Sequence, residues 1–186
     1  MKIRANGIDI EVEDTGAGAT DEAREVVLLI MGLGMQLIAW PPAFVQALVD
    51  AGYRVIRFDN RDIGLSRHFD EFGAPNLVWA AVKYRLRLPI QSPYSLKDMA
   101  ADALGVLDAL QIKRAHVVGV SMGGMIAQRV AIAASGRVIS LTSVMSSSGA
   151  RGLPEARPEV LKALLGRPKS TELKDIVGYY ARLFKV

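Results

Sequence analysis

The 186-residue chain contains no cysteine and only two histidines. Without cysteine, neither a disulfide framework nor a thiolate metal site is available, and no metal or organic cofactor is indicated. Low-complexity tracts and internal repeats are also missing, whereas 51% of the residues are hydrophobic, so we expect a packed core. The length fits one domain, or one domain and part of another.

The sequence lacks a compact basic cluster with interleaved aromatic residues, which argues against nucleic-acid binding. The formal net charge is +4. Residues 1–150 hold 15 basic and 15 acidic side chains, so the positive excess lies in residues 151–186, which hold 8 basic and 4 acidic ones. A solvated helical face accounts for this excess.

No signal peptide is recognisable, because charges recur every few residues over residues 1–10, and a cytoplasmic location is expected. From Val26 to Val49 the only polar side chains are two glutamines, which raises the question of a membrane span. Pro41 and Pro42 would break such a helix in its middle. We therefore interpret the segment as a buried strand, a glycine turn and an amphipathic helix, with no membrane partner.

Strand and helix patterns alternate along the first 150 residues. The strand-like runs are 2–5, 8–13, 26–31, 53–58, 114–120 and 138–144, and the helical patterns are 42–51, 75–86, 95–110 and 122–134. Two further amphipathic helices are predicted at about 158–165 and 171–184. The order predicts an α/β fold, a mostly parallel sheet with helices on both faces. Functional groups then belong at the C-terminal ends of the strands.

Residues 119–124 read Gly-Val-Ser-Met-Gly-Gly, between an apolar strand pattern and a helical one. This is the G-x-S-x-G nucleophile elbow in its strand-turn-helix setting, with Ser121 as the candidate nucleophile. Gly119 and Gly123 lack Cβ atoms, so the strand and the helix can approach closely around the turn. The helix that follows would place free N–H groups and a positive dipole end beside the serine.

An elbow serine also needs donors for the oxyanion, a base and an acid. The backbone N–H of Met122 is one candidate donor, and that of Leu33 is the second. Gly32 and Gly34, on either side of Leu33, would let this loop turn its amides towards a ligand. An ordinary tight turn is the alternative interpretation of these glycines.

The general base is harder to find, because both histidines precede Ser121, whereas the usual chain order in this fold class is serine, acid, histidine. His116 lies within the strand pattern before the elbow and is interpreted as structural. His68 follows a strand at the correct edge of the sheet and is a weak candidate base. The four carboxylates after Ser121 all fall in the predicted C-terminal helices, so nothing in this chain completes a triad.

In three motifs, the chain resembles the α/β-hydrolase superfamily, in particular its aclacinomycin methylesterase-like esterase branch. They are residues 28–34, Leu-Leu-Ile-Met-Gly-Leu-Gly; residues 58–66, Phe-Asp-Asn-Arg-Asp-Ile-Gly-Leu-Ser; and residues 118–124, Val-Gly-Val-Ser-Met-Gly-Gly. The resemblance covers essentially all of residues 2–186. Asp62 stands where the wider superfamily commonly has glycine, a variant that is familiar in this branch.

The resemblance implies a fold of eight strands, with a helical lid after the sixth, the triad acid after the seventh and the histidine after the eighth. By this comparison, residues 1–150 form the N-terminal part of the hydrolase core, and residues 151–186 form the beginning of the lid. The strand Val138–Val144 would then be an apolar, unpaired edge. A complementing C-terminal polypeptide or a homodimer would cover it; a truncated chain that folds poorly is the remaining possibility.

The expected function is that of a serine hydrolase that cleaves small carboxylic esters through an acyl-enzyme at Ser121, with triad acid and base absent from this chain. One alternative is a cofactor-free perhydrolase of the haloperoxidase type, which shares the scaffold and the elbow. The other is a catalytically incomplete module that only binds ligands or self-associates. The strained elbow argues against this last hypothesis, because such geometry has no evident use without catalysis.

Overall fold

The computed structural model describes residues 1–183 except 17–23, 74–76, 87, 91, 151–152, 154–156, 158, 161–165 and 167. The chain divides into two compact units, Met1–Ser148 and Gly149–Val186. The first unit holds the sheet and the predicted site. The expected role of the second unit as the start of a lid stays a prediction.

Six strands form one sheet in the order β1-β2-β4-β3-β5-β6. Their bounds are β1 Lys2–Ala5, β2 Ile8–Asp14, β3 Val26–Ile30, β4 Arg54–Phe58, β5 Ala115–Val120 and β6 Val138–Val144. The pairs β1–β2 and β2–β4 are antiparallel, whereas β4, β3, β5 and β6 run parallel. The mostly parallel sheet predicted from the alternating pattern is therefore confirmed.

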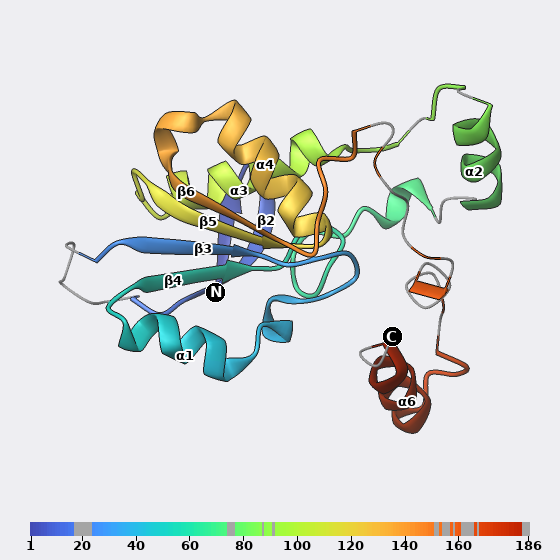
Figure 1. The fold of residues 1–186 in the computed structure, drawn as a ribbon, viewed down its shortest axis with the longest axis horizontal. Coiled ribbons are helices and arrows are strands. Elements are labelled where there is room, and N and C mark those ends of the chain that lie inside the picture. Colours follow the sequence, from blue (N-terminus) through green and yellow to red (C-terminus); the bar gives the residue numbers. More distant parts are fainter. Residues whose placement is uncertain are drawn as a thin grey trace. The chain divides into compact units, whose positions relative to one another are not determined.

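Helices cover both faces of this sheet (Figure 1). Helix α1 (Pro42–Asp50) lies on one face and helices α3 (Leu96–Ala109) and α4 (Met122–Ala133) lie on the other. All five residues of β3 are buried, as expected of a strand between two helical layers. Alternate residues of β3 enter two hydrophobic clusters: Leu28 belongs to the cluster with α3 and α4, and Leu29 to the cluster with α1.

Local signals in the sequence explain how several elements begin and end. Asn6 and Gly7 have φ angles of 48° and 78°, as the tight turn between β1 and β2 requires. Ser95 caps α3 in a capping box with Asp98. The predicted bounds of β1 and β6 match the observed ones, and most of the others differ by one or two residues. Strand β3, for example, ends at Ile30 rather than Met31, because the chain turns away there into the glycine loop.

The less regular regions match the predictions in part. Helix α2 (Leu77–Arg85) lies within the predicted 75–86, whose first two residues are outside the described part of the chain, and a 3-10 turn (Asp70–Phe72) interrupts the loop predicted over residues 60–73. In the second unit, helix α6 (Leu173–Leu183) corresponds to the prediction at 171–184. The helix predicted at 158–165 lies largely outside the described residues.

Strand β6 is the last strand of the sheet and pairs only with β5 among the described strands. Its last five residues are exposed, and they include Leu141 and Val144 with 40% and 37% of their surface accessible. This is the exposed apolar edge that the sequence predicts. In the described part of the chain, every helix is too short or too polar to cross a membrane.

Candidate active site

Ser121 occupies the turn between strand β5 and helix α4, with φ 54° and ψ −122°. A positive φ is uncommon for a residue that has a side chain, and this turn is therefore a site of backbone strain. Hydrogen bonds hold the backbone on both sides of the turn: Ser121 N–H donates to the Val144 carbonyl at 2.9 Å, and Gly124 N–H donates to the Ser121 carbonyl at 2.9 Å. The Ser121 hydroxyl has no hydrogen-bond partner among the described residues and does not cap the helix.

Two glycines allow the close packing around this turn. A Cβ atom on Gly119 would lie 2.2 Å from the Gly123 carbonyl oxygen, and a Cβ atom on Gly123 would lie 2.1 Å from the Ile30 carbonyl oxygen. Both distances are far below any real contact of a Cβ atom. The spacing of the two glycines therefore lets β5, α4 and the end of β3 meet at one point.

The loop after β3 lies directly against the serine. A Cβ atom on Gly32 would be 3.2 Å from Ser121 Cβ and 3.8 Å from Ser121 Oγ, so glycine at this position leaves the hydroxyl uncovered. Gly34 has φ 71°, a conformation that glycine adopts without strain. The N–H groups of Leu33 and Met122 donate no backbone hydrogen bond within the described chain. Both are therefore free to bind a ligand.

Buried polar side chains after β4 hold this loop in place. The Asp59 carboxylate accepts hydrogen bonds from Leu37 N–H at 2.6 Å and from Leu65 N–H at 3.0 Å. The Asn60 side-chain amide donates to the Met31 carbonyl at 3.0 Å. The C-terminal ends of β3 and β4 are thus tied together, and the three loops expected at one edge of the sheet meet there.

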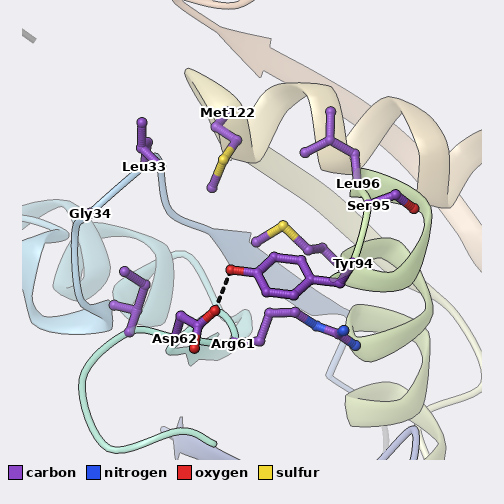
Figure 2. Close-up of a pocket in the computed structure, with 10 residues that line it drawn as sticks. Leu33, Gly34, Arg61, Asp62, Tyr94, Ser95, Leu96 and Met122 are labelled. Carbon is purple, nitrogen blue, oxygen red and sulfur yellow. Dashed lines mark hydrogen bonds between the residues drawn. The ribbon is translucent and has the colours of Figure 1, made fainter. Parts of the chain in front are cut away.

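A cavity of about 310 Å³ opens beside the turn, and Figure 2 shows the side chains around it. Its wall is mostly apolar and contains four polar side chains, those of Arg61, Asp62, Tyr94 and Ser95. The other residues of the wall are Leu33, Gly34, Ile63, Leu96, Met99 and Met122. Leu33 and Met122, whose N–H groups are the candidate oxyanion donors, are both in this wall. The volume is at the lower end of the range for small-molecule sites.

Asp62 and Tyr94 form the polar end of the cavity. The Tyr94 hydroxyl donates a hydrogen bond to Asp62 Oδ2, drawn as the dashed line in Figure 2, and Phe69 N–H donates to Asp62 Oδ1 at 2.6 Å. Partial burial, together with the hydrogen bond to Asp62, raises the pKa of the Tyr94 phenol to about 12. The phenol therefore stays protonated and keeps donating to the carboxylate.

Arg61 is paired beneath this polar end with a carboxylate from helix α3. Its guanidinium donates to Asp102 through Nε at 2.6 Å and through Nη2 at 2.7 Å, and both side chains are buried. Asn6 donates a further hydrogen bond to Asp102 at 2.8 Å. The guanidinium also lies 5.0 Å from the centre of the Tyr94 ring. Because it is bidentate and buried, this pair fixes the loop after β4 against α3.

Neither histidine forms a hydrogen bond with the Ser121 hydroxyl among the described residues. His68 is exposed, and its Nε2 lies 3.0 Å from the Gly64 carbonyl. His116 is half-buried on β5, where Nδ1 lies 2.7 Å from Ser140 Oγ and Nε2 lies 3.3 Å from a Glu25 carboxylate oxygen. The structural interpretation of His116 fits these contacts. The weak assignment of His68 as a base gains no support from its contact.

The described residues contain no group of three or more histidine, cysteine or acidic side chains placed to hold a metal ion. Three of the carboxylates that follow Ser121 are described, and two of them have local partners. Glu172 pairs with Lys174 at 2.9 Å, and Asp175 accepts a hydrogen bond from Ser170 at 2.6 Å.

The sequence analysis did not identify Tyr94, Arg61 or Asp102 as part of the site. Asp62 was noted there only as a departure from the usual glycine. Its φ of 63° explains the departure, because this backbone conformation suits glycine but is also tolerated by aspartate. The presence of a charged residue at a glycine position was the one available signal for the polar end of the cavity.

Comparison with known proteins identifies the family. A family model described as alpha/beta hydrolase fold matches residues 25–174. The chain belongs to this family. Rhodomycin D methylesterase DauP of Streptomyces sp. (strain C5) is 37% identical to it over 138 residues, which are 74% of this chain and 40% of that protein. A putative non-heme bromoperoxidase of Mycobacterium tuberculosis, BpoC, is 31% identical over 76% of this chain and 43% of its own length.

Solved structures show the same fold. A meta-cleavage product hydrolase from Pseudomonas fluorescens IP01 matches the whole chain and 55% of its own, with a TM-score of 0.68 and 23% identity. The enol-lactonase from Burkholderia xenovorans LB400 has a TM-score of 0.55 and 26% identity, over 74% of this chain and 44% of its own. The chain thus spans about half the length, or less, of these four proteins.

Proposed function

We propose that this chain carries the nucleophile and the oxyanion donors of a serine hydrolase that acts on carboxylic esters. The observation that carries the proposal is the conformation of Ser121. With a φ of 54°, Ser121 sits in the sharp turn between strand and helix, its hydroxyl has no hydrogen-bond partner among the described residues, and Gly32 leaves that hydroxyl uncovered.

In the proposed reaction, Ser121 Oγ attacks the ester carbonyl carbon and gives its proton to a general base. The N–H groups of Met122 and Leu33 bind the oxygen that becomes negative, helped by the positive end of α4. The tetrahedral intermediate then collapses, the carbonyl–oxygen bond to the alcohol breaks, and the alcohol leaves with a proton. Water releases the acid from the acyl-enzyme in a second round of the same steps.

The proposal places the general base and its acid outside these 186 residues. Neither histidine contacts the Ser121 hydroxyl within the described chain. A complementing C-terminal polypeptide, joined to the chain or separate, would supply both groups and would cover the exposed edge of β6. On its own, the chain is expected to retain only the modest rate that oxyanion binding and substrate positioning provide.

Similarity to the rhodomycin D methylesterases supports an ester of a small molecule as the substrate. The similarity to BpoC supports the alternative, a cofactor-free perhydrolase. Halogenation that depends on peroxide, without ester hydrolysis, would favour this alternative. The third possibility, a module that only binds ligands or pairs with itself, is favoured if substitution of Ser121 changes neither reaction.

The test is hydrolysis of short-chain aryl esters by the chain and by its Ser121→Ala variant. We expect the unsubstituted chain to become acylated at Ser121, seen as a slow release of at most one aryl alcohol per chain and as labelling by a fluorophosphonate probe, read by intact mass and peptide mapping. Ser121→Ala should show neither, whereas the slow turnover that the oxyanion donors alone provide should be the same in both.

Ser140→Ala is the matched control. Ser140 lies on neighbouring β6, where its hydroxyl contacts His116 Nδ1 at 2.7 Å, and the other ring nitrogen of His116 lies 3.3 Å from a Glu25 carboxylate oxygen. Any hydrolysis that arises from this second serine–histidine–carboxylate arrangement would disappear in the control variant and persist in Ser121→Ala. That result would contradict the proposed role of Ser121.

A further inference from the structure

The polar end of the cavity offers hydrogen-bond acceptors. Each oxygen of the Asp62 carboxylate accepts one hydrogen bond from the protein, from Phe69 N–H or from the Tyr94 hydroxyl. A carboxylate has about four acceptor positions, so roughly two remain. The Tyr94 oxygen has already donated its hydrogen, and it too can only accept. The Ser95 hydroxyl, also in the wall, donates to Asp98 at 2.7 Å.

The charge at this end is negative. Among the described residues that line the cavity, Arg61 is the only cation, and Asp102 neutralises it through two hydrogen bonds in a buried pair. Within the described part of the chain, the Asp62 carboxylate therefore has no ion-pair partner. Asp98, bound to Ser95 at the rim, adds to the negative potential. A ligand group that enters this end meets acceptor oxygens and a net negative charge.

The opposite part of the wall is apolar and adjoins the proposed reaction centre. In the view of Figure 2, Leu33, Leu96 and Met122 lie on one side of the Tyr94 ring, and Asp62 lies near its hydroxyl. The cavity thus runs from the candidate oxyanion donors, at Leu33 and Met122, to the pair Asp62–Tyr94. A substrate bound at the donors would extend its far end towards that pair.

Resting on the esterase function proposed above, we propose that Asp62 and Tyr94 are specificity-determining residues of this hydrolase. They select esters with an apolar body and a hydrogen-bond donor, a hydroxyl or an ammonium group, at the end remote from the reacting carbonyl. Esters that carry a carboxylate at that end are disfavoured, because their charge would face the uncompensated Asp62.

Binding of a matched set of ligands tests this proposal without any turnover. The set is 4-phenylbutylamine, 4-phenylbutan-1-ol and 4-phenylbutyrate, which share one skeleton and differ in the terminal group. We expect the amine to bind the full chain about tenfold more tightly than the carboxylate, with the alcohol between them, in calorimetric or NMR titrations. Equal affinities, or tighter binding of the carboxylate, would overturn the proposal.

Methionine methyl resonances identify where the ligands bind. Met99 and Met122 line the cavity, whereas Met145 is 80% exposed and lies outside its wall. We expect the amine to shift the first two methyl signals and to leave that of Met145 unchanged. Shifts confined to other methionines would show binding elsewhere and would also overturn the proposal.

Asp62→Asn removes the charge while keeping the shape. Asparagine tolerates the positive φ at this position, its oxygen can accept from Phe69 N–H, and its amide can donate to Tyr94. We expect the preference for the amine over the carboxylate to fall to about twofold or less. Glu71→Gln is the matched control, because Glu71 is an exposed carboxylate paired with Arg67, and this variant is expected to keep the full preference.

Aryl esters that carry the same three terminal groups, amine, alcohol and carboxylate, at the end remote from the carbonyl separate this proposal from the esterase function. If the amine preference holds but Ser121→Ala is acylated as readily as the unsubstituted chain, the cavity selects donors and the nucleophile assignment fails. If Ser121 is required but the charge of the ester's far end does not alter kcat/KM in the unsubstituted chain or in Asp62→Asn, the specificity proposal fails alone.

Discussion

Gly123 and Ile30 are so close that no side chain could stand between them: a Cβ atom on Gly123 would lie 2.1 Å from the Ile30 carbonyl oxygen. This contact brings the start of α4 against the end of β3. The glycine loop after β3 consequently lies beside the Ser121 turn, with Gly32 over the serine. The second glycine of the G-x-S-x-G pattern is thus a packing requirement of the tertiary structure as well as of the turn.

We expect Gly123→Ala to destabilise the chain by about 2 kcal/mol or more, because the new methyl group meets backbone atoms that cannot move independently. Urea unfolding, followed by circular dichroism, measures the change. Gly136→Ala is the matched control: a Cβ atom there would meet nothing within 4 Å. The control should change the free energy of unfolding by less than about 1 kcal/mol. A similar loss of unfolding free energy in both variants would show that the close contact of Gly123 with Ile30 does not cause the destabilisation.

Asp102→Asn is expected to destabilise the chain by about 3–5 kcal/mol, because it leaves the buried Arg61 charge without its partner. Asp108→Asn, on the same helix, is the control, since Asp108 is exposed and pairs with Arg137 at the surface. Its cost should stay below about 1 kcal/mol. Thermal unfolding of both variants at one pH decides the point. A small effect of Asp102→Asn would mean that water reaches Arg61 when the carboxylate is removed.

Much of the fold follows from local patterns that act within a few residues. The Asn6-Gly7 turn, the Ser95 cap of α3 and the apolar run of β3 were each predicted from neighbours in the chain, and each is confirmed. The strand-turn-helix around Ser121 was predicted in the same way, from glycines two residues to either side. Such signals can be recognised in the sequence because a tight turn, a helix cap and a buried strand each restrict which residue types fit at neighbouring positions.

The polar end of the cavity could not be predicted in this way, because its partners are remote in sequence. Tyr94 and Asp62 are 32 residues apart, and Arg61 and Asp102 are 41 residues apart. No spacing rule links them, and only the packing of α3 against the loop after β4 brings them together.

The capping box of α3 should make stability depend on pH in the acid range. Hydrogen bonds from Ser95 hold the pKa of the Asp98 carboxyl below its ordinary value of 3.8. A depressed folded-state pKa adds stability that is present above the unfolded-state pKa and is lost as pH falls through the folded-state pKa. We therefore expect Asp98→Asn to be less stable than the unsubstituted chain at pH 7, and the difference to shrink below about pH 4.

Unfolding titrations of the chain, Ser95→Ala, Asp98→Asn and the double variant, at pH 7 and pH 3, measure this effect. The coupling between the two residues should be favourable at pH 7 and much smaller at pH 3. A coupling that is the same at both pH values would show that the neutral carboxyl caps the helix equally well.

The exposed edge at β6 should make the isolated chain associate with itself. Strand β6 pairs only with β5 among the described strands, and it presents Leu141 with 40% of its surface accessible. Unpaired apolar edges are templates for pairing with another chain. We expect Leu141→Lys to lower the weight-average mass in sedimentation velocity at micromolar concentrations, because a charge at the edge opposes strand addition.

Ile132→Lys provides the comparison that separates edge pairing from general stickiness. Ile132 is 83% exposed, more than Leu141, but it lies on helix α4 and has no free strand edge beside it. If strand pairing drives association, the lysine on β6 lowers the mass and the lysine on α4 leaves it unchanged. If exposed apolar area alone drives it, the substitution on α4 has the larger effect, since it removes the more exposed side chain.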